Sequence, residues 1–84
     1  MARPKVQLLV LKSFGANLRR LRVQAGLTQA KFAERVAVEL RTQQKFEAGE
    51  INVPLATLVR IQNALGCPWD ALLGQPKAKS VRTS

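Results

Sequence analysis

The sequence predicts an all-α domain of five short helices packed around one shared core. The chain has 84 residues, which suffice for one small domain. Hydrophobic residues make up 46% of it and charged residues 23%, a balance that is typical of a globular chain. Leu, Val and Ala recur at helical spacing, and glycines and prolines interrupt that pattern where helices should begin or end.

Residues 1–12 are expected to form a basic and apolar arm ahead of the domain. Arg3 and Lys5 supply the charge. The apolar run at 6–11 fits either a short strand or an added helical turn, because periodicity cannot separate the two over six residues.

The first two helices of the domain have clear end signals. Ser13 is a residue type that caps helix N-termini, and Gly26 follows the first helix as a C-terminal glycine does. Thr28 is expected to cap a shorter second helix that ends at Val36. Apolar residues recur every three or four positions in both segments, so each helix has a face for a core.

The remaining three helices follow in the same manner. A polar third helix is expected over 39–47, and its spacing from the second helix is that of a helix-turn-helix. Pro54 and Pro68 open the fourth and fifth helices. The predicted domain therefore spans residues 13–74, and the polar, basic residues 75–84 are expected to be a disordered tail.

The net charge of +9 indicates a polyanionic partner. Fourteen Lys and Arg stand against five Asp and Glu. The excess lies in residues 1–22 and 75–84, whereas residues 23–74 are balanced. This favours nucleic acid over a membrane surface as the partner, and the plain alternative is surplus charge that only keeps a small protein soluble.

Other residue types argue against several classes of protein. A single cysteine, Cys67, allows no internal disulfide and fits a reducing cytoplasm, where we expect the protein. No run approaches the roughly 20 apolar residues that cross a bilayer. The chain has no histidine and no pattern of metal ligands, so we expect no enzyme, no metal and no other cofactor, and no small-molecule ligand is evident.

Residues 14–74 resemble the helix-turn-helix domain of phage repressors and Cro proteins, the lambda-repressor-like or XRE family. The matching residues are Arg22, the Gly-Leu-Thr-Gln corner at 26–29, Phe32, Ala33, Phe46, Glu47, Gly49, Pro54, Leu65 and Gly66. The resemblance implies a sequence-specific transcriptional regulator, with repression expected, that binds double-stranded DNA at a palindromic operator as a homodimer.

Three residues depart from the family's pattern. Ala37 stands where the turn usually has glycine, and Glu39 stands where the next helix usually has a Ser or Thr cap. We interpret Glu39 as a cap nonetheless, with a contact to a cytosine amino group as the alternative. Gln43 stands where most members place a buried Ile or Val, so we predict a partly buried amide that bonds to the backbone or a neighbour.

The resemblance implies that the third helix lies in the major groove and that the second crosses the DNA backbone. By motif position, the residues expected to read base edges are Leu40, Arg41, Gln44 and Lys45. The residues expected to contact phosphates are Gln29, Thr42, Asn52, Arg3, Lys5 and Arg19. Arg22 and Glu47 are implied to form a structural ion pair between the first helix and the end of the third. The alternative for the DNA contacts is a set of solvated surface side chains.

Two apolar clusters exceed what so small a core needs, and exposed clusters of this kind mark association. The residues expected at a dimer interface are Leu8, Leu9, Trp69, Leu72 and Leu73. The alternative is that both clusters complete the core of one molecule. Two other functions stay open. The first is an antitoxin-like module that neutralises a partner protein and autoregulates its promoter. The second, a minor interpretation, is attachment to a membrane surface through residues 1–12.

Overall fold

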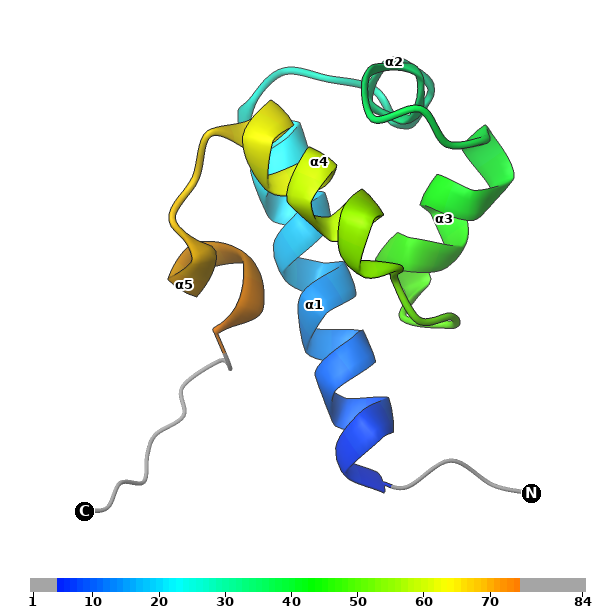
Figure 1. The fold of residues 1–84 in the computed structure, drawn as a ribbon, viewed down its shortest axis with the longest axis vertical. Coiled ribbons are helices and arrows are strands. Elements are labelled where there is room, and N and C mark those ends of the chain that lie inside the picture. Colours follow the sequence, from blue (N-terminus) through cyan, green and yellow to red (C-terminus); the bar gives the residue numbers. More distant parts are fainter. Residues whose placement is uncertain (1–4, 75–84) are drawn as a thin grey trace.

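Five α-helices and no strand make up the part of the chain that the computed structural model describes, residues 5–74, which confirms the predicted all-α fold (Figure 1). The helices are α1 (Lys5–Gln24), α2 (Gln29–Arg35), α3 (Leu40–Ala48), α4 (Leu55–Leu65) and α5 (Trp69–Leu73). The Thr28 side chain caps α2 as predicted, because its Oγ1 accepts a hydrogen bond of 3.1 Å from the backbone N–H of Lys31.

The first helix is longer than the sequence suggested. It begins at Lys5, so the prediction that Ser13 caps it is wrong, and the apolar run at 6–11 is helical. Nothing after Pro4 breaks the helix, and the buried Leu11 secures the added turns to the core. Ser13 instead donates its hydroxyl to the carbonyl of Gly74 over 3.4 Å.

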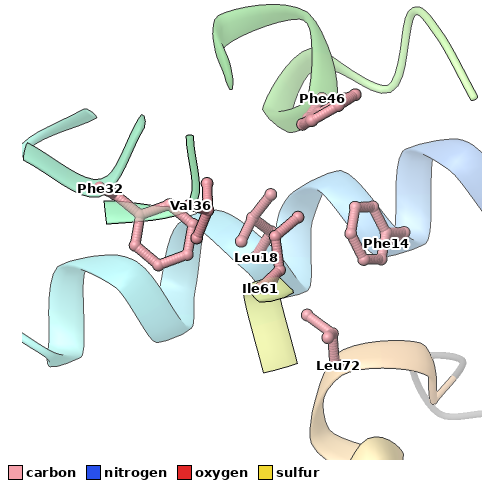
Figure 2. Packing of buried hydrophobic residues seen from close by; sticks show 7 residues of the cluster. All are labelled: Phe14, Leu18, Phe32, Val36, Phe46, Ile61 and Leu72. Atoms are coloured by element: carbon pink, nitrogen blue, oxygen red, sulfur yellow. The ribbon is translucent and has the colours of Figure 1, made fainter. Parts of the chain in front are cut away.

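Every helix contributes to one core, which extends along α1 (Figure 2). The buried apolar residues that form it are Phe14, Leu18, Phe32, Val36, Phe46, Ile61 and Leu72. Helices of five to eleven residues are unstable alone, so α2 to α5 depend on this shared burial. Leu72 has no exposed surface, and its prediction as a dimer contact is therefore wrong: α5 turns this side chain into the core of its own molecule.

Close approach of α3 to α1 depends on Gly15, a residue that the sequence analysis did not single out. A Cβ atom at Gly15 would lie 2.5 Å from the carbonyl oxygen of Glu47 and 2.7 Å from that of Phe46. Since real Cβ atoms do not come so close to carbonyl oxygens, any larger residue would push α3 away from α1. The C-terminal end of α3 is thereby held directly against α1.

The turn between α2 and α3 passes through a left-handed residue that is not glycine. Ala37 has φ of 62°, and the backbone N–H of Val38 then reaches the carbonyl of Ala33 over 2.9 Å. This conformation destabilises an L-residue by roughly 1 to 2 kcal/mol, whereas glycine has no Cβ atom and adopts it without this penalty. The departure from the family's glycine at this turn therefore leaves strain in the motif.

We expect Ala37→Gly to raise the free energy of unfolding by about 1 kcal/mol, because relief of the left-handed strain exceeds the added freedom of the unfolded chain. Urea unfolding followed by circular dichroism measures this. The matched control is Ala30→Gly on the exposed side of α2, which should lower the same quantity by about 1 kcal/mol through helix propensity. A loss of stability in both variants would contradict the role given to Ala37.

Candidate nucleic-acid interface

One side of α3 is polar and exposed. Arg41, Gln44 and Lys45 are exposed, and together with Ala48 and Glu50 they line one shallow groove. Leu40, at the first position of α3, is 43% exposed. The four side chains predicted to read base edges therefore lie in solvent on α3.

The opposite side of α3 faces the core. Phe46 is buried in the cluster of Figure 2, and Gln43 has no exposed surface. The Gln43 amide donates to the Glu47 carboxylate over 2.8 Å, which confirms the predicted inward amide with a neighbouring partner. Its Oε1 atom is buried without a hydrogen-bond partner among the described residues. The register assumed for α3 is therefore the observed one.

The Glu47 carboxylate accepts four hydrogen bonds from three helices. Arg22 on α1 donates through Nε at 2.6 Å and through Nη2 at 3.1 Å, which gives the expected ion pair a bidentate geometry. Gln29 on α2 donates to the same carboxylate over 3.0 Å, and Gln43 on α3 completes the set. Because both charged side chains are almost fully buried, this group ties α3 to α1 and α2.

The pKa of Glu47 reports the balance of these contacts. Burial raises this pKa. A larger opposite effect comes from the hydrogen bonds of Arg22, Gln29 and Gln43 and from the positive charge of Arg22, so that the pKa lies below its ordinary value of 4.5. Glu47 is therefore ionised at neutral pH.

The C-terminal end of α3 is also capped from α1. The Lys12 ammonium donates to the carbonyl of Ala48 over 2.9 Å, and Gly49 ends the helix in a left-handed conformation with φ of 71°. A Cβ at Gly49 would lie 2.9 Å from the Cα of Lys12, so the chain passes close to α1 here as well. The sequence analysis identified Gly49 but missed Lys12.

The predicted phosphate contacts are spread over several elements. Gln29 is the first residue of α2, and one of its amide hydrogens is already used by Glu47. Thr42 and Asn52 line a second groove, where α3 meets the start of α4, and the Asn52 Oδ1 accepts from Gln7 over 3.2 Å. The structure does not bring the basic candidates into this groove: Lys5 and Arg19 are exposed on α1, and Arg3 lies outside the described residues.

Glu39 occupies the N-cap position of α3 but does not cap the helix with its side chain. Its backbone is extended, with φ of −74° and ψ of 152°, and no hydrogen bond joins its carboxylate to the first turn. Glu39 therefore holds the predicted N-cap position, but its side chain forms no capping hydrogen bond. Glutamate is not among the residue types preferred for a side-chain cap.

Exposed apolar side chains lie on α1, α4 and α5. Among the residues expected at a dimer interface, Leu8, Leu9, Trp69 and Leu73 are all more than a third exposed. Leu55, at 76% exposed, and Val59 are exposed on α4 and were not predicted. Leu55 follows the apolar spacing of the rest of α4, so the sequence pattern alone did not indicate that this side chain lies outside the core.

Within residues 5–74, no helix is long and apolar enough to cross a membrane, and no three His, Cys, Asp or Glu side chains are placed to hold a metal ion.

We expect Glu47→Gln to lower the free energy of unfolding by about 3 kcal/mol at neutral pH, because it leaves the buried Arg22 without a counter-charge. Since the pKa of Glu47 is lower in the folded chain than its ordinary value of 4.5, the ionised carboxylate stabilises the fold above that pH. The stabilisation is lost as pH falls through the folded pKa. The gap between wild type and variant should therefore narrow on acidification.

Urea unfolding from about pH 7 down to about pH 3 tests this dependence. Glu34→Gln removes an exposed carboxylate from α2 and serves as the control, with a small effect at every pH. A gap between wild type and Glu47→Gln that stays constant over this range would contradict the account of the ion pair.

Comparisons with known proteins agree with this architecture. A family model described as a helix-turn-helix domain matches residues 13–73. The clp gene regulator ClgR from Corynebacterium glutamicum has a similar structure, with 31% identity, a TM-score of 0.72, and coverage of 76% of this chain and 69% of that one. Comparison with curated proteins gave no match.

The restriction-modification controller protein C.AhdI from Aeromonas hydrophila is similar too, with 31% identity and a TM-score of 0.69 over 74% of this chain and 94% of that one. The helix pair α2 and α3 and the exposed polar face of α3 are the parts with which such a domain docks on DNA. The chain belongs to the lambda-repressor-like, XRE-type helix-turn-helix family of DNA-binding transcription regulators.

Proposed function

We propose that the protein is a transcriptional repressor that binds a palindromic operator as a homodimer and places α3 of each subunit in the major groove. The observation that carries this proposal is the division of α3 into two sides. Gln43 and Phe46 face the core, whereas Arg41, Gln44 and Lys45 are exposed. A helix in this position of a helix-turn-helix presents its exposed side to base edges.

The exposed side chains suit different bases. Arg41 forms a fork of donors that matches the O6 and N7 acceptors of guanine, and Lys45, one turn further on, donates to a second guanine or to a phosphate. Gln44 matches the donor and acceptor of adenine, and Leu40 offers an apolar contact to a thymine methyl. The half-site is therefore expected to contain guanine opposite Arg41.

Backbone contacts would come from residues around α3. The Gln29 amide has one hydrogen left for a phosphate beyond its bond to Glu47, at the N-terminus of α2, where backbone N–H groups favour an anion. Thr42 and Asn52 flank α3 in the second groove. These contacts orient the domain on the duplex and carry little sequence information.

Two-fold pairing is supported by the exposed apolar side chains. Leu8, Leu9, Trp69 and Leu73 lie in solvent in the single chain, and apolar surface of this kind favours association. A dimer with two-fold symmetry would place its two α3 helices on half-sites about one helical turn apart, which explains why a palindrome is expected.

Selection of duplexes from fragments of the source genome should enrich an inverted repeat that the protein binds far more tightly than random DNA. With that repeat, Arg41→Ala should weaken binding by about 1 to 3 kcal/mol and relax the base preference at one position of each half-site. Arg19→Ala removes an exposed charge outside α3. It should weaken binding to every sequence alike and reduce the slope of the salt dependence.

Fluorescence anisotropy with the selected and a scrambled duplex, at several salt concentrations, separates the two effects. Equal affinity of the wild type for both duplexes at physiological salt would refute specific regulation. Identical behaviour of Arg41→Ala and Arg19→Ala would instead show that α3 does not read the bases.

The wild type should sediment as a dimer at micromolar concentration, and Trp69→Glu should shift it towards the monomer, because a charge cannot be buried unpaired at an apolar interface. Val23→Glu is the matched control: Val23 is exposed on α1 and apolar, but lies outside the predicted interface. Circular dichroism checks that both variants fold. A wild-type monomer that also binds DNA with one subunit per duplex would overturn the dimer.

A further inference from the structure

Glu39 is a carboxylate without a partner at the start of α3. It is exposed, and within residues 5–74 no hydrogen bond or ion pair engages its side chain. Glu47 differs in this respect, because its carboxylate accepts four hydrogen bonds and forms an ion pair with Arg22. Neither a capping hydrogen bond nor an ion pair therefore explains a glutamate at this position.

Among the described residues, no basic side chain forms an ion pair with Glu39. Arg60 lines the same groove, but its guanidinium is turned to other partners: Nε donates to the carbonyl of Val36 over 2.9 Å and Nη2 to the hydroxyl of Thr57 over 3.1 Å. Thr42 and Asn52, on the same groove, carry no charge. The carboxylate is thus available to a ligand.

We propose that Glu39 is a specificity-determining residue that accepts a hydrogen bond from the N4 amino group of a cytosine in each half-site. The inference rests on the proposed function, because it requires α3 to enter the major groove. In that arrangement the N-terminal residues of the helix contact base edges, and Glu39 directly precedes Leu40 and Arg41, which are expected to do so.

The chemistry of the major groove selects cytosine. An ionised carboxylate only accepts hydrogen bonds, so the acceptors O6 and N7 of guanine and O4 of thymine repel it. Adenine offers an amino group, but the neighbouring N7 acceptor repels the second oxygen. Cytosine presents its amino group without an adjacent acceptor, and it is therefore the base that a carboxylate favours.

Charge repulsion also favours a base over a phosphate as the DNA group beside Glu39. A carboxylate beside a phosphate would weaken every complex alike, whereas at an amino group it makes a favourable bond and rejects other bases at once. Glu39 would then select for one base at its position in the half-site.

The test is to select duplexes from a random library with the wild type, Glu39→Gln and Glu39→Ala. The wild type should enrich cytosine at one position of each half-site, with other bases disfavoured on the order of tenfold. Glu39→Gln should shift that position to adenine, because an amide pairs with N6 and N7, and Glu39→Ala should lose the preference there. The other enriched positions should stay the same for all three proteins.

A modified base gives a second, independent readout. N4-methylcytosine at the selected position replaces the groove-facing N–H by a methyl group while it keeps the base pair. It should weaken binding of the wild type about tenfold and leave Glu39→Ala almost unaffected. Thermal unfolding of the variants should match the wild type, since the Glu39 side chain forms no hydrogen bond or ion pair with the residues that the structure describes.

The outcomes separate this inference from the proposed function. If the wild type enriches no sequence at all, the proposed function fails. If it enriches a repeat and Glu39→Ala enriches the same repeat with uniformly tighter binding, Glu39 only repels phosphates, and the inference fails while the function stands. Equal sensitivity of the wild type and Glu39→Ala to N4-methylcytosine would likewise overturn it.

Discussion

The buried ion pair between Arg22 and Glu47 is the interaction on which the placement of α3 depends. This helix has nine residues and places only Gln43 and Phe46 in the core, which is too little apolar surface to hold it in one orientation. The carboxylate of Glu47 fixes the orientation of the helix, because it accepts hydrogen bonds from donors on α1, α2 and α3 itself. Breaking a pair of this kind leaves a charge uncompensated in a dry site, so the pair enforces one arrangement more strongly than it adds net stability.

Close backbone contact with α1 completes this constraint. Gly15 allows the carbonyls of Phe46 and Glu47 to approach α1, and Lys12 caps the carbonyl of Ala48 at the end of α3. All of these contacts lie at the C-terminal end of the helix. Its N-terminal half, from Leu40, is left free of packing on its outer side. A helix anchored at one end in this way can insert its other end between phosphate backbones without losing its own support.

The sequence allowed the element order, the caps at Thr28 and Gly49 and the inward Gln43 to be predicted, because these depend on local chemistry or on a motif with fixed spacing. It misplaced the start of α1, since a segment of six residues is compatible with more than one conformation, and in the folded chain the buried Leu11 packs the helical form against the core. It also assigned Leu72 to an interface. Apolar spacing cannot tell a core from an interface when both require the same residue types.

The sequence by itself determined the helices, their order and the family, because capping residues, glycines and a helix-turn-helix spacing act over short distances along the chain. Only the tertiary structure decided which side chains are free. Glu39 stands at the N-cap of α3 and Glu47 within it, yet among the described residues the first is unpaired and the second is bonded to Arg22, Gln29 and Gln43. That difference comes from residues 4 to 25 positions away in the sequence. It exists only once α1 and α2 pack against α3.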